Sequence, residues 1–350
     1  MGIRVHLASV VLLASLTLSA QTTPAPNANN VQAPAQTLLG QGWGVDHLMV
    51  GVRDLAQAEH DYGQLGFKTW NHGQFPGGEF NSHVYFQKNS FLELLSVNGS
   101  TPIKQGMTAQ IANFLKRHEG AMALGIDVSS AQAAADYLKA RNVAVNGPHT
   151  GTVKWEQETT PGMWYWVSPS EPAAGQKGLP LPVFFVEYVA TRNAEARAVG
   201  AMDHPNTAMG IHSVWFAVHD AETHLRSLRD IGLEVGESRE VKFLSAHGRE
   251  VKVGQGVLLI LESSNNDGLL AKYLSDRVGP QGRCNCPEDD GIIGLSVEVA
   301  DLGKARQLAE SGTGTKLETY KGFYGPSFVL PPDVTHGMWM EMFQAGEHLQ

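Results

Sequence analysis

The stretch GVDHLMVGVRDL at residues 44–55 decides the fold. It begins as an apolar run with the length of a strand, and residues 54–65 then carry apolar side chains at helical spacing. Gly66 ends that helix. Two more apolar runs, HVYFQ at residues 83–87 and FLELLSV at residues 91–97, predict strands after the helix. This part of the chain therefore predicts a unit of one strand, one helix and further strands.

The same pattern recurs three more times. Opening strands are predicted at residues 120–128, 210–218 and 291–299, and each leads through a helix to an apolar last strand. Connections between the later strands of a unit are too short for crossover helices, so antiparallel pairing is favoured. The sequence predicts an α+β fold in which four βαβββ units form two modules, at residues 41–200 and 205–346.

The first 20 residues have the features of a signal peptide. Arg4 supplies a positive charge, residues 7–18 form an apolar stretch, and Ala20 ends a small-residue cleavage site. The apolar stretch is shorter than the roughly 20 residues that span a bilayer. Residues 21–40 are rich in Pro, Ala and Asn and predict a flexible tether. We therefore expect an exported protein, periplasmic or extracellular, with no transmembrane span after signal cleavage.

Charge and cysteine content narrow the classes of partner. A formal net charge of −9 argues against nucleic acid, because phosphate binding needs a basic face. Cys284 and Cys286 are the only cysteines, and two thiols are too few for a structural zinc site. Two interpretations of this pair stay open. The first is a loop with two incidental thiols or a weak disulfide, and the second is a functional pair that is redox-labile or captures a metal.

Histidines and glutamates repeat with the units. His47 and His212 occupy similar places in the opening strands of units one and three. A glutamate also interrupts the apolar last strand of each unit; these are Glu93, Glu187, Glu262 and Glu341. An ionised carboxylate among apolar side chains is costly unless it is paired, hydrogen-bonded or bound to a metal. The repetition therefore predicts functional sites on these strands.

The motifs resemble one known superfamily. The relevant stretches are DHLMVGVRDL, the LGF after the first helix, FLELL, and HPNTAMGIHSVWFAV at the start of the second half. Over residues 44–345 the chain resembles vicinal-oxygen-chelate proteins, and among them the glyoxalase-like domain group. The resemblance implies curled mixed or antiparallel sheets around a cup. It also implies that the first and last strands of each unit supply up to four metal ligands.

Mapped onto this chain, the resemblance implies a divalent metal ion such as Zn, Mn, Ni or Mg. The implied ligands are His47, Glu93 and Glu187 in the first module and His212, Glu262 and Glu341 in the second. Glu187 or Glu93 would be the catalytic base. Substrate contacts are expected from His72, Asn81, His83 and Trp166. Ala123 and Gly294 leave the remaining ligand positions without a donor.

The expected function is that of an exported lyase or isomerase that depends on a divalent metal. Its substrate would be a small molecule that chelates the metal through oxygen, and the protein would be a monomer or homodimer. The alternative is a metal-free protein of the same fold that binds an aromatic or apolar ligand, and a purely structural role is a third reading. The pairing of units also stays open: one with two and three with four, or one with four and two with three. In the second arrangement His47, Glu93 and Glu341 would share a site.

Overall fold

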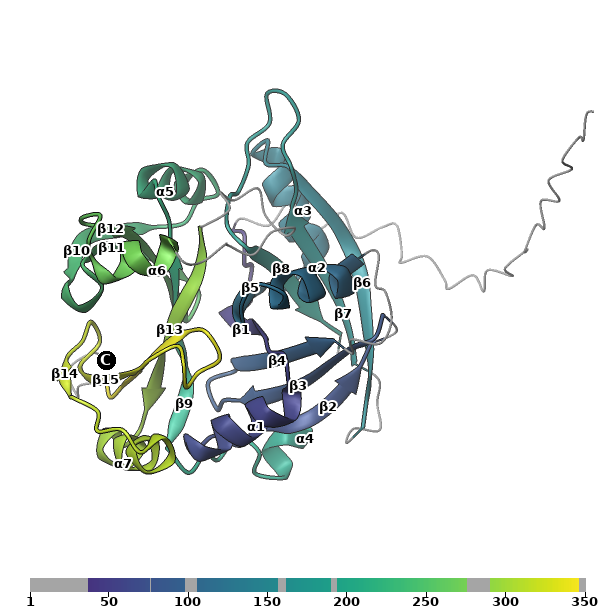
Figure 1. Ribbon diagram of the computed structural model, residues 1–350. Helices are drawn as coiled ribbons and strands as arrows, with labels where there is room; N and C mark the ends of the chain where they lie inside the picture. Colours follow the sequence, from purple (N-terminus) through teal and green to yellow (C-terminus); the bar gives the residue numbers. More distant parts are fainter. Residues whose placement is uncertain are drawn as a thin grey trace, which may run out of the picture. The chain divides into compact units, whose positions relative to one another are not determined.

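The computed structural model describes residues 37–75, 77–97, 106–156, 162–189, 194–275 and 290–345 (Figure 1). The predicted signal peptide, most of the predicted tether, Cys284 and Cys286 lie outside these ranges. Within them, no helix is long and apolar enough to cross a membrane. The described residues form two sheets with helices packed on them, which confirms the predicted α+β fold of two modules.

The first sheet closes into a barrel with the strand order β1-β4-β3-β2-β6-β7-β8-β5. β1 runs parallel to β4 and antiparallel to β5, so the opening strands of units one and two are direct neighbours. Its strands are β1 (Gly44–Gly51), β2 (Trp70–Gln74), β3 (Glu79–Tyr85), β4 (Phe91–Val97), β5 (Gly120–Asp127), β6 (Val145–Trp155), β7 (Gly162–Pro169) and β8 (Val183–Tyr188).

The second sheet has eight strands in the order β10-β11-β12-β9-β13-β16-β15-β14. Here β9 and β13, the opening strands of units three and four, pair antiparallel. Units therefore pair one with two and three with four. The strands are β9 (Ala208–Ala217), β10 (Val235–Val241), β11 (Ala246–Val253), β12 (Gly256–Ser263), β13 (Gly291–Val299), β14 (Tyr320–Lys321), β15 (Pro326–Leu330) and β16 (Trp339–Phe343).

The helix of each unit begins in the same way. A polar residue directly before the helix accepts a hydrogen bond from the backbone N–H three positions on, which satisfies one of the free donors of the first turn. These caps are Asp54, Ser130, Asp220 and Asp301. The unit helices are α1 (Leu55–Gln64), α3 (Ala131–Ala140), α5 (Ala221–Asp230) and α7 (Leu302–Thr313). The other helices are α2 (Gly106–Leu115), α4 (Ala194–Ala198), the short 3₁₀ helix η1 (Lys242–Leu244) and α6 (Leu269–Ser275).

Alternating side chains of β1 belong to two different cores. Leu48 packs into the large cluster that also contains Tyr62 of α1. Met49, on the opposite face, packs with Phe114 of α2. We call the Met49 side the inner face of the barrel, and α2 lies against it (Figure 1). In the second sheet α6 packs against Trp215 in the same manner.

His204 is a buried histidine in the segment that leads into β9. Its Nδ1 accepts a hydrogen bond from the Lys68 N–H at 3.0 Å, and its Nε2 lies 2.8 Å from the Tyr85 carbonyl oxygen, to which it donates. Because one nitrogen accepts and the other donates, the neutral ring satisfies both contacts. Burial lowers the pKa of His204 to about 4.

This buried imidazole predicts a loss of stability in mild acid. At position 204 the unfolded chain binds a proton near pH 6.5, whereas the folded chain does so only near pH 4. The contribution of neutral His204 to the free energy of unfolding is therefore fully present above pH 6.5 and is lost as the pH falls from 6.5 to 4. The loss from this group amounts to about 3 kcal/mol. Urea unfolding of His204→Gln, which cannot take up the proton, should show a smaller loss over this range. The exposed His60→Gln should follow the wild type; equal slopes in all three proteins would contradict the assignment.

Candidate functional site

A bulge in β1 brings two neighbouring side chains together at the inner face of the barrel. The register of β1 against β5 shifts between Val45 and His47, so Asp46 has no partner of its own on β5. A bulge re-aims side chains because strict alternation between the faces is interrupted. Asp46 and His47 are 0% and 5% exposed, and Asp46 Oδ2 lies 2.6 Å from His47 Nδ1.

The ring of His47 is held by three neighbours. It stacks on Phe91 of β4, with ring centroids 4.5 Å apart, and meets the ring of Phe184 of β8 edge-on at 5.3 Å. Gly125 of β5 lies directly opposite His47, and a Cβ at that position would overlap the imidazole. The absence of a side chain at Gly125 therefore makes room for the ring.

Hydrogen bonding fixes which nitrogen of His47 faces the inner side. Tyr188 of β8 donates from its hydroxyl to Asp46 Oδ2 at 2.9 Å. An ionised carboxylate only accepts, so the short contact between Asp46 and His47 assigns the ring proton to Nδ1. Nε2 then faces Glu93, whose Oε2 is 3.6 Å away. This geometry orients the imidazole for proton transfer at Nε2.

Glu93 of β4 is held by side chains of β3. Asn81 donates from Nδ2 to Glu93 Oε1 at 2.8 Å. His83 lies opposite Glu93 in the strand register, and its Nε2 is 3.4 Å from Asn81 Nδ2. Its Nδ1 lies 3.0 Å from the Asn71 carbonyl oxygen, to which it donates. The structure thus brings the predicted residues His47, Glu93, Asn81 and His83 into one buried cluster.

Aromatic side chains surround this cluster. His83 contacts the ring of Trp155 of β6 at 5.1 Å and stacks on Tyr85 at 5.0 Å. Trp166 of β7, predicted to contact substrate, packs partly buried against the inner-face core, and its ring lies 4.6 Å from that of His149. The polar cluster is therefore set in a largely apolar surface.

Glu187 and His72 do not join the cluster. In β8 the side chains of Val186 and Tyr188 belong to the inner face, so the alternation of a strand sends Glu187 to the other face. There its Oε2 accepts a hydrogen bond from the Ala131 N–H, at the start of α3, at 2.8 Å. His72 Nε2 lies 2.6 Å from Glu59 Oε1 of α1, at a partly exposed place. The structure does not place either residue beside His47.

The donor set in the barrel does not fit the implied metal ion. A catalytic zinc site takes three protein ligands. His47 Nε2 and Glu93 are two convergent donors, but the positions that face them from β5 and β8 are Gly125 and Phe184. Over the residues that the structure describes, no group of three or more His, Cys, Asp or Glu side chains is arranged to hold a metal.

The second sheet carries different residues at the matching register positions. Ser213 lies opposite Val257 of β12 and Ser296 of β13, as His47 lies opposite Phe91 and Gly125. Ser213 is thus the counterpart of His47. The adjacent residue, His212, sits at a bulge as Asp46 does.

The same register shows that the four glutamates do not stand at equivalent places. In β12, Leu259 lies opposite Trp215, as Glu93 in β4 lies opposite Met49, so the counterpart of Glu93 is a leucine. Glu341 pairs with Ser296, and its counterpart in the barrel is Phe184, which pairs with Gly125. The shared place inferred from the spacing of the four glutamates is therefore not seen.

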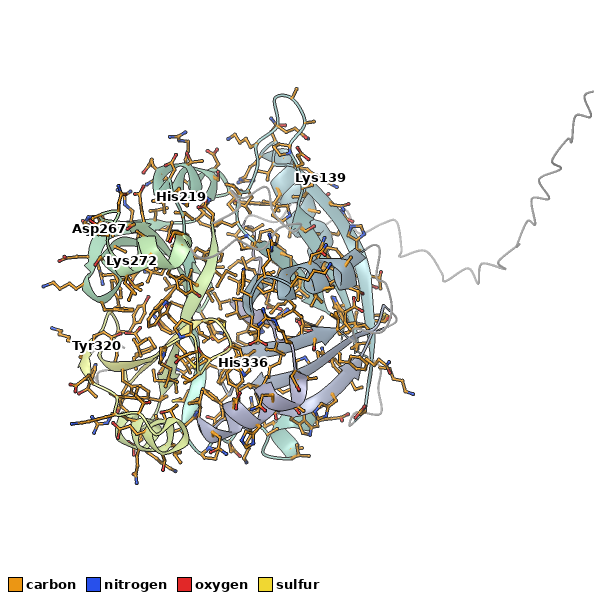
Figure 2. All side chains as sticks on the ribbon, viewed as in Figure 1. Lys139, His219, Asp267, Lys272, Tyr320 and His336 are labelled. Carbon is orange, nitrogen blue, oxygen red and sulfur yellow. The ribbon has the colours of Figure 1, made fainter. Side chains whose placement is uncertain are left out.

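Glu341 ends a buried chain of hydrogen bonds. Ser296 donates to Glu341 Oε2 at 2.7 Å, and Tyr320 of β14, labelled in Figure 2, donates to Oε1 at 2.8 Å. The indole N–H of Trp215 is shared between Ser213 and Ser296. Burial raises the pKa of Glu341, and the hydrogen bonds from Ser296 and Tyr320 oppose that rise.

His212 and Glu262 lie apart from this chain of hydrogen bonds. The ring of His212 packs against Tyr324 at 4.1 Å and Phe343 at 5.3 Å, and burial lowers the pKa of His212. Glu262 of β12 lies opposite His247 of β11 and is partly buried. It follows Leu261, whose side chain packs in the cluster with Trp215. No contact joins His212, Glu262 and Glu341 among the described residues, so the ligand set implied for the second module is not assembled.

Sequence reasoning missed four polar participants. Asp46 had a visible signal, because a carboxylate directly precedes His47 within an apolar strand. Tyr188, Ser213 and Ser296 had none, since hydroxyl residues are common in strands and their faces depend on bulges that the sequence does not reveal.

Gly125→Ala tests the packing around His47. The added Cβ overlaps the imidazole, and overpacking of a core typically costs about 2 kcal/mol. We expect this loss in urea unfolding, with a changed ring environment of His47 in NMR spectra. The matched control is Gly63→Ala in α1, where nothing lies within 4 Å of the new Cβ and a small gain is expected. A Gly125→Ala protein as stable as the wild type would contradict the packing argument.

Glu341→Gln tests the buried carboxyl group. An acid whose folded pKa is raised stabilises the protein below its unfolded pKa, and this stabilisation is lost as pH rises through the folded pKa. In urea unfolding, the free energy of unfolding of Glu341→Gln relative to the wild type should therefore increase as the pH rises above the ordinary pKa of a glutamate. Glu262→Gln is the control, because Glu262 also lies in the last strand of its unit but is only partly buried. The opposite trend would show that the site stabilises the ionised carboxylate.

Comparison with known proteins adds to this geometry. A family model described as a glyoxalase-like domain matches residues 45–232, more than half of the chain. No curated protein matches. A crystal structure of a hypothetical protein from Staphylococcus aureus has the same fold, with a TM-score of 0.58 and 12% identity over 86% of this chain and 98% of that one.

Two further solved structures align over shorter parts. Methylmalonyl-CoA epimerase from Mycobacterium tuberculosis gives a TM-score of 0.34 and 17% identity over 41% of this chain and 92% of that chain. A variant of the Streptomyces coelicolor epimerase in complex with 2-nitronate-propionyl-CoA gives 0.33 and 19% over 39% and 94%. The match of the family model over residues 45–232 shows that this chain belongs to the glyoxalase-like domain family of the vicinal-oxygen-chelate superfamily.

Proposed function

We propose that the inner face of the barrel is the active site of an exported isomerase or lyase that moves a proton on a small oxygen-bearing substrate. The observation that supports this is the buried series Tyr188–Asp46–His47, which leaves His47 Nε2 directed towards Glu93. Two proton acceptors whose atoms lie 3.6 Å apart suit a substrate whose C–H or O–H group approaches both of them from the inner side of the barrel.

The proposed step is abstraction of a proton from carbon next to a carbonyl group. His47 Nε2 takes the proton, and the electron pair of the broken C–H bond moves onto the carbonyl oxygen as an enolate. The imidazolium that forms is stabilised by the Asp46 carboxylate at 2.6 Å from Nδ1. Return of the proton to a different carbon or face gives isomerisation, and loss of a group on the next carbon gives lysis.

Glu93 has the second role in this proposal. Asn81 fixes one carboxylate oxygen, and the other lies 3.6 Å from His47 Nε2. From this place Glu93 exchanges a proton with a substrate hydroxyl or carbonyl oxygen next to the carbon that His47 deprotonates. Because Asn81 already orients the carboxylate, less conformational entropy is lost when Glu93 exchanges the proton.

A divalent metal has no step in this mechanism. Its implied third ligand, Glu187, is engaged with the start of α3, and the facing positions Gly125 and Phe184 offer no donor. Proton transfer by His47 and Glu93 therefore carries the proposal.

The aromatic side chains around His83 favour a second candidate function, the binding of an aromatic ligand without turnover.

Solvent-deuterium incorporation separates these functions. Candidate hydroxycarbonyl and diketone compounds are incubated with the purified protein in D₂O, and exchange at carbon is followed by NMR. We expect exchange with at least one compound, a loss of about 100-fold or more in His47→Gln and in Glu93→Gln, and no effect of EDTA. Tyr188→Phe should be less damaging, because Asp46 still orients His47.

His72→Gln is the matched control, since His72 also faces a carboxylate but lies outside the cluster. Exchange that persists in His47→Gln would refute the assigned base. Loss of exchange on EDTA treatment would refute the metal-free mechanism. Tight binding of aromatic compounds with no exchange by any of them would favour the binding function instead.

A further inference from the structure

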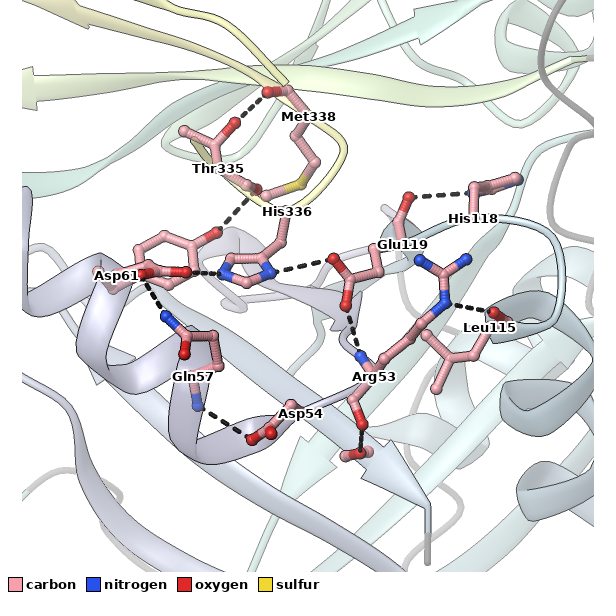
Figure 3. A network of polar contacts seen from close by, with 12 residues as sticks. Arg53, Asp54, Gln57, Asp61, Leu115, His118, Glu119, Thr335, His336 and Met338 are labelled. Carbon is pink, nitrogen blue, oxygen red and sulfur yellow. Dashed lines mark hydrogen bonds and ion pairs between the residues drawn. The ribbon is translucent and has the colours of Figure 1, made fainter. Parts of the chain in front are cut away.

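His336 stands at a contact between the two halves of the chain, on the loop between β15 and β16. Its Nδ1 lies 3.1 Å from Glu119 Oε2 and its Nε2 lies 3.2 Å from Asp61 Oδ2 (Figure 3). The side chain is only 10% exposed. Asp61 belongs to α1, and Glu119 lies in the turn between α2 and β5. One histidine of the second half thus meets two carboxylates of the first.

The surrounding groups hold these carboxylates in place. Glu119 Oε1 accepts a hydrogen bond from the Arg53 N–H at 2.6 Å, and Arg53 Nε donates to the Leu115 carbonyl oxygen at the end of α2 (Figure 3). Tyr62 of α1 stacks on His336 with centroids 5.9 Å apart, and its hydroxyl lies 3.3 Å from the Thr335 carbonyl oxygen.

The loop and the turn also touch through their backbones. A Cβ at Gly337 would overlap the carbonyl of Glu119, so only glycine allows this approach. Gly337 has a φ of +85° and His336 a φ of +54°, so both residues occupy the left-handed region. The carbonyl of Gly337 accepts a hydrogen bond from Tyr273 of α6 at 2.7 Å. The contact therefore reaches from α1 and the turn after α2 to the helix on the second sheet.

Each nitrogen of His336 faces a carboxylate oxygen: Nδ1 is within hydrogen-bond distance of Glu119, whereas Nε2 is at ion-pair distance from Asp61 without hydrogen-bond geometry. Carboxylates accept hydrogen bonds, and a neutral imidazole offers a donor on one nitrogen only. With a carboxylate oxygen near each nitrogen, only the imidazolium form presents a proton to both. The charged groups around the ring are Asp61 on α1, Glu119 in the turn, and Arg53 on the far side of Glu119. The other nearby residues with titratable side chains are Tyr62 and His118.

The electrostatics of Glu119 agree with a cationic partner. Burial alone would raise the pKa of this carboxyl group, but the contacts with His336 and Arg53 outweigh burial and lower it below its ordinary value. The folded structure therefore favours the Glu119 carboxylate in its ionised form.

We propose that Asp61, His336 and Glu119 form a proton-dependent latch between the two halves of the chain. The latch is closed when His336 carries a proton on each nitrogen and both carboxylates are ionised. It weakens when the imidazole loses one proton at higher pH or when a carboxylate gains one in acid. Because Glu119 lies in the turn between α2 and β5, the latch also fixes the end of the helix that lies on the inner face of the barrel.

The direct test is long-range ¹H–¹⁵N NMR of the histidine rings in the full chain, with the His336 signals identified by their absence in His336→Gln. We expect two protonated ring nitrogens while the latch is closed, and a single one once the ring is deprotonated by raising the pH. In the same step, hydrogen exchange of the α2 amides should become about tenfold faster after division by the intrinsic exchange rate at each pH. A single protonated nitrogen at every pH at which the chain is folded would overturn the proposal.

Variants give an independent measurement. His336→Gln and Glu119→Gln are compared singly and together by urea unfolding, and the change in midpoint of the double variant should be smaller than the sum of the single changes. His60→Gln on the exposed side of α1 is the matched control. Additive changes, or α2 exchange in His336→Gln equal to that in the control, would overturn the latch. If His336→Gln does not fold, Asp61→Asn provides the same comparison at the other nitrogen.

Discussion

The antiparallel pairing of two opening strands is the contact on which the rest of the structure depends. β1 pairs with β5 and β9 pairs with β13, and each pairing contains bulges. The pairing joins two units into one sheet, and its bulges turn neighbouring residues to the same side. In the barrel this places Asp46 beside His47, which regular alternation would have separated. The backbone irregularity is therefore what creates the polar cluster.

The two sheets show how one architecture takes up different chemistry. At matching positions the barrel has His47, Gly125 and Glu93, whereas the second sheet has Ser213, Ser296 and Leu259. The first set includes a ring nitrogen and a carboxylate that face each other. The second set consists of hydroxyl and apolar groups, and its carboxylate enters from another strand as Glu341. This difference in side chains is the reason that we propose proton transfer in the barrel and not on the second sheet.

The sequence was sufficient for the fold because its signals were local and repeated. Apolar runs and helical spacing recur in each unit, and they predicted the helix and the first and last strands of each unit, whereas α2 and α4 were not predicted. His47, Glu93, Asn81 and His83 were also predicted, since polar residues within buried strands are conspicuous. Glu187 was not placed with them, because a strand that is apolar on both faces does not reveal which residues turn inward. A bulge also decides that Ser213, and not His212, takes the position in the second sheet that His47 takes in the barrel. Bulges are set by pairing between distant segments, so the sequence did not reveal this one.

A buried carboxylate needs a partner, and this fold supplies several kinds. Glu187 accepts a backbone N–H at a helix start, Glu341 accepts hydroxyl donors, and Glu119 faces a histidine with Arg53 behind it. The contacts of Glu119 outweigh burial and lower its pKa, whereas for Glu341 burial outweighs the hydroxyl donors and its pKa is raised. Glu93 differs, because Asn81 satisfies one oxygen while the other faces His47 Nε2 at 3.6 Å, too far for a hydrogen bond. In that cluster Glu93 Oε2 lies next to an oriented imidazole with no hydrogen bond between them, which is the arrangement that the proposed proton transfer requires.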